Sequence, residues 1–506
     1  MARVQTNVIA NLIGQGWAAL LQIALVPFYL HFLGVESYAL ISFYVMLITG
    51  VQIFDLGLAQ TLNRELARLS VNAQGAAEMR DLVRTMEVVY WGVVTTVCMV
   101  LALLMPLIAR HVMNPNQIDP DSLRRVLYMM VIVIMLNWPA NLYFSGLMGL
   151  QKQVLVNKLR ILLSTVSSLG ALLALWLVSP TILMFFGWQI MAGMLALVVM
   201  AAALRTGLPA AIGHARFRPE LLSRTWRFAA GVSGLTISAL VLTQLDKWIL
   251  INLLSLEAFG YFSLAIAVAN ALNLLVTPVF SAIYPRLTVL IAEGKHAVLE
   301  QVYHISTQVV AVTVVPAALF LSFYSHEVLL LWTRNEKVAI HSGPILSLYV
   351  IGTALNGLMH IPYARELARG STRIFFIFNL VAIAVLGPTV WYFAPKIGAI
   401  ISAIGWIALN AAYFVIAIPL IHAGMDRREQ FRWYLRDITV PAVAAILVLG
   451  AGRIFLPEGL PPIGLLATLA VILVLAVAAA GLAAPEVRNT IKAGARKWLA
   501  GTGTAN

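Results

Sequence analysis

The sequence has a single cysteine, Cys98, among its 506 residues. Because one cysteine cannot form a disulfide framework or a cluster of thiolate metal ligands, both are excluded. Cys98 itself lies in an apolar run. Charge is also scarce, because Asp, Glu, Lys and Arg make up 11% of the chain, against about 25% in soluble domains. Hydrophobic residues make up 61%, and the mean hydropathy is +0.89. This composition excludes a large soluble protein and predicts a polytopic membrane protein.

Short motifs that accompany catalysis are missing too. The sequence contains no GxxxxGK[ST] loop for nucleotide phosphates, and no HExxH, CxxC or GxSxG motif. A membrane glycosyltransferase or polymerase would need acidic residues on a sizeable outer loop. Asp119 and Asp121 lie on a short connection and support that alternative weakly. We therefore predict that the chain is not an enzyme and uses no cofactor or metal.

Long apolar segments are what the sequence has in abundance. About fourteen of them approach the length of about 20 residues that crosses a bilayer. The predicted fold is therefore all-α. Most of the 34 Lys and Arg residues fall at the termini and in connections after every second segment, which makes that side, and both termini, cytoplasmic. The excess over 21 Asp and Glu residues then reflects topology and anionic lipid, with nucleic acid an unlikely partner.

A short internal repeat predicts two lobes. LGVESYALISF at 33–43 resembles LSLEAFGYFSL at 254–264, although chance similarity between apolar segments is an alternative. Each run lies at the first hairpin of a six-helix block. We predict two parallel six-helix repeats with the functional site between them. The expected parts are an N-terminal lobe at 1–215, a C-terminal lobe at 216–437, and an extra helix pair with a cytoplasmic tail at 438–506.

Polar side chains recur on one face of several apolar segments. Interhelical hydrogen bonds, worth about 0.6 kcal/mol each on average, explain any single one, whereas long stripes favour a hydrated cavity. Amides and aromatic rings suit sugars, and Lys247, His360, Arg64 or Arg160 could add positive charge for a phosphate. The candidate cavity residues are Asn7, Asn11, Gln15, Gln22, Tyr29, Asn137, Asn141, Lys247, Asn270, Asn273, Asn356 and His360.

Two adjacent charges, Asp246 and Lys247, lie deep in the apolar segment 231–254. A charge at such depth costs roughly 2.5–3.5 kcal/mol, so it must face protein or water. Adjacent helical residues point in different directions, and Lys247 shares its face with Thr243. Lys247 is therefore the better cavity candidate, while Asp246 could equally pair with a neighbouring helix. Asp55 and Asp246 are the candidate ion-coupling carboxylates.

Three segments resemble the polysaccharide repeat-unit flippases, the Wzx-type O-antigen exporters of the MOP superfamily. They are FDLGLAQTLNRELARL at 54–69, LTQLDKWILINLLSLEAFGYFSLAIA at 242–267 and YPRLTVL at 284–290. The superfamily also contains the lipid II flippase and the MATE drug exporters. Ala39 departs from the glycine of the family's LGxxxYG pattern, and Gly260 keeps that glycine in the second copy.

The resemblance implies a bacterial inner-membrane carrier that moves an undecaprenyl-diphosphate-linked oligosaccharide to the periplasmic leaflet. It implies two lobes that alternate between inward- and outward-open states, with membrane lipids, a polysaccharide polymerase and chain-length proteins as partners. Coupling to protons or sodium is expected of such a carrier. A lipid II flippase is one alternative. A MATE-like drug antiporter is another, and the extra helix pair at 438–484 counts against it.

Overall fold

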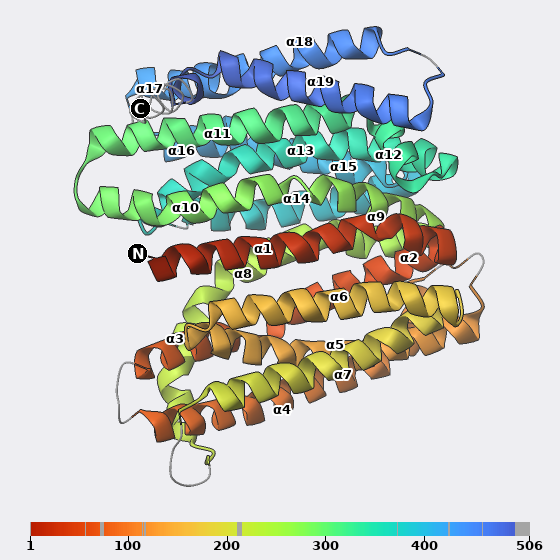
Figure 1. Cartoon of the computed structure of the whole chain (residues 1–506), viewed down its shortest axis with the longest axis vertical. Helices are drawn as coiled ribbons and strands as arrows, with labels where there is room; N and C mark the ends of the chain where they lie inside the picture. The colour runs from red at the N-terminus through yellow and green to blue at the C-terminus, as the bar shows by residue number, and fades with distance from the viewer. Residues whose placement is uncertain are drawn as a thin grey trace, which may run out of the picture. The chain divides into compact units, whose positions relative to one another are not determined.

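The computed structural model describes residues 2–55, 57–70, 75–113, 115, 118–209, 215–371, 373–423, 426–457 and 459–490, with side chains except those of 2–12, 111 and 222–236. The α-helices are α1 (Ala2–Ala24), α2 (Val26–Val51), α3 (Leu58–Leu69), α4 (Ala76–His111), α5 (Pro120–Gly149), α6 (Gln153–Leu177), α7 (Ile182–Gly207), α8 (Pro219–Leu253), α9 (Leu256–Asn270), α10 (Asn273–Ala292), α11 (His296–Phe323), α12 (Ser325–Thr333), α13 (Glu336–Ala368), α14 (Arg373–Ile397), α15 (Ile400–Ala412), α16 (Ile418–Ile421), α17 (Arg427–Arg432), α18 (Val440–Ile454) and α19 (Pro462–Ala483). A 3₁₀ turn, η1 (Gln52–Asp55), and two π-helical turns, η2 (Tyr413–Ala417) and η3 (Trp433–Thr439), interrupt them (Figure 1).

The part of the chain that the structure describes is helical and contains no strand. Twelve of its helices are long and apolar enough to cross a membrane. Large apolar side chains such as Leu447, Ile454 and Ile463 are exposed on α18 and α19, as expected of residues that face lipid. The prediction of an all-α polytopic membrane protein is confirmed, and the count of fourteen spans stays a prediction.

The apolar segments 38–62 and 257–283, each of which the sequence predicts as one helix, are both broken. The segment 38–62 divides into α2 and α3 at η1 and Gly57, whose φ of 73° suits a residue without a Cβ atom. The segment 257–283 divides into α9 and α10 at residues 271–272, between Asn270 and Asn273. Asparagine side chains compete with the helix for backbone hydrogen bonds, which favours a break there.

The chain forms two compact units, residues 1–260 and 261–506, and the boundary falls within α9. In the first unit α5 is the central helix and packs against α3, α4, α6 and α7. Met130, Ile134, Trp138 and Leu142 recur every four residues along its buried face, the spacing of one helical stripe. The lobe boundaries predicted from the sequence stay predictions.

In the second unit α13 is the central helix and packs against α10, α11, α12 and α15. Helices α18 and α19 lie side by side and pack on α11 (Figure 1). The contact is apolar: Phe320 and Tyr324 of the α11 end meet Leu449, Leu469 and Ile472 in one buried cluster. The helix pair is therefore an integral part of the second unit.

Gly260, in the second copy of the repeat, packs directly on the first copy within unit 1. A Cβ atom at Gly260 would lie 2.7 Å from both the carbonyl oxygen and Cγ1 of Val35, and 3.4 Å from Cβ of Ala39. We expect Gly260→Ala to lower the free energy of unfolding by about 1–3 kcal/mol, because the backbone must move apart. Thermal unfolding in detergent measures this. In the control Gly92→Ala, the new Cβ meets no atom within 4 Å, and an equal loss there would contradict the prediction.

Candidate functional site

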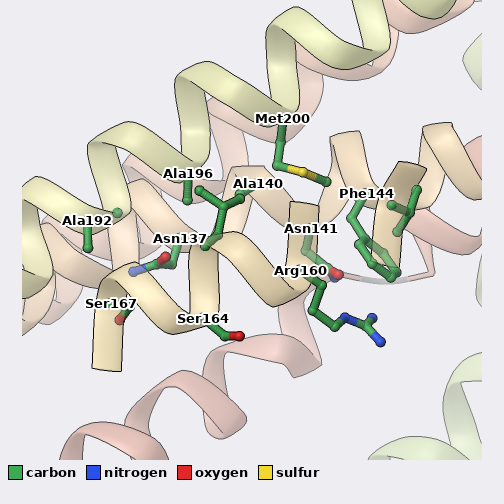
Figure 2. Close-up of a pocket in the computed structure, with 13 residues that line it drawn as sticks. Asn137, Ala140, Asn141, Phe144, Arg160, Ser164, Ser167, Ala192, Ala196 and Met200 are labelled. Atoms are coloured by element: carbon green, nitrogen blue, oxygen red, sulfur yellow. The ribbon is translucent and has the colours of Figure 1, made fainter. Parts of the chain in front are cut away.

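A cavity of about 390 Å³ opens within the first unit between α5, α6 and α7 (Figure 2). This volume lies in the usual range for small-molecule sites, about 300–1,000 Å³. Small side chains on the α7 face, Ala192, Gly193 and Ala196, leave the space open. The lining combines these with amides, hydroxyls and one charged group; it comprises Asn137, Ala140, Asn141, Phe144, Val156, Arg160, Leu163, Ser164, Ser167, Ala192, Gly193, Ala196 and Met200.

Arg160, on α6, is the charged residue of this lining (Figure 2). Its guanidinium carbon lies 4.5 Å from the centroid of the Phe144 ring on α5, a distance at which the cation is attracted to the ring face. This contact orients the guanidinium without using its N–H donors. An arginine held in this way can bind phosphate or carboxylate through two parallel hydrogen bonds. A charged residue within a membrane-spanning helix is costly to place there, which is a further reason to expect a functional role for Arg160.

The uncharged polar groups of the cavity suit a ligand rich in hydroxyls. Ser167 donates its hydroxyl hydrogen to Gln189 Oε1 at 2.8 Å, and Ser164 donates to the Ile161 carbonyl at 3.1 Å. Asn137 donates to the Val133 carbonyl at 3.0 Å through one amide hydrogen. Hydroxyl oxygens and amide groups retain further hydrogen-bonding capacity after one such bond. The lining can therefore bind hydroxyls both as donor and as acceptor.

Asn137 and Asn141 are the sequence-predicted residues that line this cavity. Tyr29, also predicted, is buried, and its hydroxyl donates to the Ser168 carbonyl at 2.8 Å. Tyr29 thus joins α2 to α6 through an interhelical hydrogen bond.

Two predicted residues of α1 that the structure describes, Gln15 and Gln22, are not among the residues that line the cavity. Gln15 and Gln22 are exposed on α1. The side chains of Asn7 and Asn11 lie outside the described residues.

Lys247 and Asp246 both contact groups of their own helix, α8. Lys247 Nζ lies 3.1 Å from the Thr243 carbonyl oxygen and 3.3 Å from Gln244 Oε1. Asp246 Oδ1 accepts from the backbone N–H of Lys247 at 2.9 Å. An ammonium group has three donors, so Lys247 can bind an anion in addition to these two acceptors.

Asp55 stabilises a helix start. Its Oδ1 accepts from the Tyr90 hydroxyl at 2.7 Å, and the backbone N–H groups of Gly57 and Ala59 also donate to its carboxylate. These N–H groups belong to the first turn of α3 and its N-cap, where a carboxylate is favourable. The structure therefore gives Asp55 a capping role, and its ion-coupling role stays a prediction.

The predicted residues of the second unit are partly committed to helix contacts. Asn356 Nδ2 donates to Asn410 Oδ1 at 3.0 Å, which joins α13 to α15. His360 lies next to it, with Nδ1 3.0 Å from the Asn356 carbonyl oxygen and its ring edge-on to Phe280. Asn270 is exposed at the end of α9, and Asn273 is half-buried at the start of α10.

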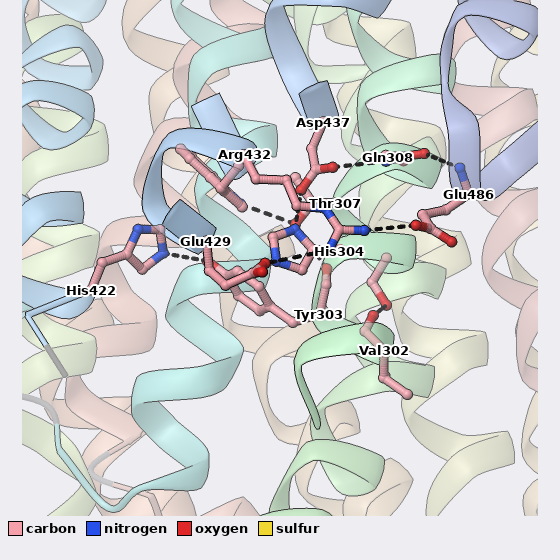
Figure 3. A network of polar contacts seen from close by, with 12 residues as sticks. Val302, Tyr303, His304, Thr307, Gln308, His422, Glu429, Arg432, Asp437 and Glu486 are labelled. Carbon is pink, nitrogen blue, oxygen red and sulfur yellow. Dashed lines mark hydrogen bonds and ion pairs between the residues drawn. The ribbon is translucent and has the colours of Figure 1, made fainter. Parts of the chain in front are cut away.

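Sequence reasoning missed part of the cavity and a second polar cluster. Phe144, Ser164 and Ser167 belong to no distinctive motif, and the sequence identifies Arg160 only as one source of positive charge. The available signal was an arginine inside a membrane segment. The second cluster surrounds His304 in unit 2 (Figure 3), and its signal was a polar stripe on α11 that includes Thr307 and Gln308.

Comparison with solved structures identifies the fold. The chain is similar to the lipid II flippase MurJ in an inward closed conformation, with a TM-score of 0.71 at 11% identity, covering 96% of this chain and 99% of that one. It is also similar to an inward-facing MATE family multidrug transporter of the MOP superfamily, with a TM-score of 0.63 at 15% identity, covering 82% and 95%.

Sequence comparison identifies the family. A Shigella flexneri protein that carries the provisional name O-antigen transporter is 22% identical over 411 residues, which cover 79% of this chain and 93% of that protein. The model of one protein family, described as polysaccharide biosynthesis protein, matches residues 4–290. This match spans more than half of the 506 residues, so the chain belongs to the polysaccharide biosynthesis protein family and is a multi-pass membrane protein of MOP-superfamily fold.

Proposed function

We propose that the protein is a flippase that moves an undecaprenyl-diphosphate-linked oligosaccharide, the repeat unit of a surface polysaccharide, across the bacterial inner membrane. The observation that carries this proposal is the cavity of α5, α6 and α7, where Arg160 stands among amides and hydroxyls inside membrane-spanning helices. Membership of the polysaccharide biosynthesis protein family and similarity to a protein named for O-antigen transport support it.

The chemistry of the cavity matches the two polar parts of such a substrate. Moving sugar hydroxyls into hydrocarbon without hydrogen bonds costs several kcal/mol per group. Asn137, Asn141 and Ser167 would replace water around them. Arg160 would pair with a phosphate or an acidic sugar, while the lipid tail stays in the bilayer. We take the two predicted lobes, at 1–215 and 216–437, to alternate between inward- and outward-open states during transport.

The proposal includes an orientation and partners. Most of the 34 Lys and Arg residues fall in the connections assigned to one side, and we take that side, with both termini, as cytoplasmic. A polysaccharide polymerase and chain-length proteins would then receive the substrate on the opposite side.

Two related functions are the alternatives. The MATE-family structure covers 82% of this chain, whereas the lipid II flippase structure covers 96%. The fuller coverage favours a flippase over a drug antiporter. A lipid II flippase differs in its substrate and in being required for cell-wall growth.

A deletion strain distinguishes these functions. The proposed function predicts viable cells that lack surface polysaccharide and accumulate the lipid-linked repeat unit on the inner leaflet. Normal surface polysaccharide with drug sensitivity would support the antiporter instead. Arrest of cell-wall synthesis would support the lipid II flippase.

Lys247 gives a residue-level test of the substrate contact. We expect Lys247→Ala to reduce complementation of the deletion strain by roughly tenfold, the value of one charge-assisted hydrogen bond, while the protein still inserts. Surface polysaccharide per inserted protein measures this. Lys158, exposed near the start of α6, is the matched control and should tolerate alanine. Full complementation by Lys247→Ala would exclude the role of Lys247.

A further inference from the structure

A buried polar cluster in the second unit centres on His304 of α11 (Figure 3). The side chain of His304 is 1% exposed, and that of Asp437 on η3 is 0% exposed. Nδ1 of His304 contacts Asp437 Oδ2, and Nε2 lies 2.8 Å from Glu429 Oε2 on α17. The Nε2 contact lacks hydrogen-bond geometry, but both ring nitrogens lie within ion-pair distance of a carboxylate, and only the protonated ring carries the positive charge that such a pairing needs. The geometry therefore fits an imidazolium between two carboxylates.

Both carboxylates are held by further contacts. Gln308 Nε2 donates to Asp437 Oδ1 at 2.7 Å, and Gln308 Oε1 accepts from the backbone N–H of Glu486 at 2.8 Å. Arg432 Nη1 lies 3.4 Å from Glu429 Oε2, and Arg432 Nη2 lies 2.7 Å from Glu486 Oε1. Among the ion pairs of the described residues, Arg432 is the cation that contacts Glu429 and Glu486 when His304 is neutral. Protonation of His304 supplies the second cation.

The other titratable and charged groups near His304 lie after α16, on α13 and on α11. His422 follows α16, and its Nε2 lies 2.7 Å from the Tyr303 hydroxyl. On α13 the guanidinium of Arg365 lies over the Tyr303 ring, 5.2 Å from its centroid, and Arg369 pairs with Glu366 at 3.3 Å. Glu300 lies one turn earlier on α11. Asp437 and Glu429 are the groups that face the His304 ring nitrogens directly.

We propose that His304 is a proton-binding site and that its protonation docks α17 and η3 onto α11. Loss of the proton would leave the buried Asp437 carboxylate without its cation, and an uncompensated buried charge is strongly unfavourable. The segment formed by α17 and η3 would then separate from α11 until His304 binds a proton again.

The proton has a route from the more exposed edge of the cluster. Glu429 and Glu486 are 23% and 24% exposed, unlike Asp437 and His304. Glu429 contacts His304 directly and is the group through which a proton would arrive. Proton binding at His304 does not depend on the identity of the transported substrate. The proton site can therefore be absent from a flippase, and it can be present in a protein that transports another substrate.

Hydrogen–deuterium exchange of purified protein in lipid nanodiscs tests the proposal. The exchange rates of the amides at 427–439 are compared between variants at the same pH, so that the intrinsic effect of pH on exchange cancels. In the wild-type protein, protection should be present when His304 is protonated and fall as pH rises, by at least about tenfold. His304→Gln should exchange at the fast, high-pH rate at every pH.

Two further variants make the test specific. His304→Gln combined with Asp437→Asn removes both charges and should restore most of the protection without pH dependence, which also keeps the test valid if the single variant does not fold. His422→Gln, another buried histidine, should keep the wild-type pH dependence. Wild-type protection that is constant with pH, or loss of the dependence in His422→Gln as in His304→Gln, would overturn the proposal.

Discussion

Replacement of Arg160 by glutamate is expected to abolish surface polysaccharide in a complemented deletion strain. Arg160 is the cation of the α5–α6–α7 cavity and is held over the Phe144 ring. Losing hydrogen bonds to a charged group costs about 1.5–3 kcal/mol each, and a carboxylate in its place would repel a phosphate or an acidic sugar. We expect transport to fall at least a hundredfold, on the order of two such bonds.

Arg160→Lys separates charge from shape. Lysine keeps the positive charge but lacks the planar fork and the ring contact of arginine, so we expect intermediate transport. Arg68, which is 57% exposed and pairs with Glu65 on α3, is the control: Arg68→Ala should complement normally. Surface polysaccharide is measured per amount of inserted protein. Full complementation by Arg160→Glu would show that the α5–α6–α7 cavity does not bind the transported substrate.

The largest expected effect on stability is at Asp437. Its carboxylate is fully buried and accepts from Gln308 while it contacts His304. Asp437→Ala leaves His304 and Gln308 without this acceptor in a buried site. Breaking a buried pair by removing one partner costs about 3–5 kcal/mol, so we expect a loss of this size in the free energy of unfolding.

Denaturant unfolding in detergent, followed by tryptophan fluorescence, measures the loss. Trp433 is a suitable reporter because it is fully buried beside the cluster and donates to Thr307 Oγ1 at 3.1 Å. Asp121, exposed in the first turn of α5, is the matched control, and Asp121→Ala should cost less than about 1 kcal/mol. Equal losses for the two variants would mean that the cluster contributes nothing to stability.

The fold could be predicted from the sequence because the bilayer sets the length and composition of its helices. The unpredicted breaks, at Gly57 and at residues 271–272, lie inside apolar segments. Hydropathy carries no signal for such breaks, because they depend on backbone conformation and on the packing of neighbouring helices.

The candidate site was harder to predict. A polar stripe identifies a face of one helix but not the helix that meets it. Tyr29 and Asn356 lie on such stripes, yet the structure uses them to join helices. Asn137 and Asn141 line a cavity because the facing positions of α7 are small. That pairing of helices is a property of the fold.

The His304 cluster was even harder to predict from the sequence, because its residues are far apart in the chain. His304, Glu429, Asp437 and Glu486 come from three separate parts of the chain. In sequence, the basic residues around 427–436 indicate a cytoplasmic connection. Their acidic neighbours gain significance only when the fold brings them to His304.

We expect this protein to move a lipid-linked oligosaccharide across a membrane. Purified protein in sealed vesicles that contain an undecaprenyl-diphosphate-linked oligosaccharide tests it directly, with a glycosidase that cannot cross the membrane added outside. We predict that the wild-type protein makes substrate from the inner leaflet accessible to the enzyme, well beyond the fraction in protein-free vesicles and in vesicles with Arg160→Glu. The same accessible fraction in all three preparations would contradict the account.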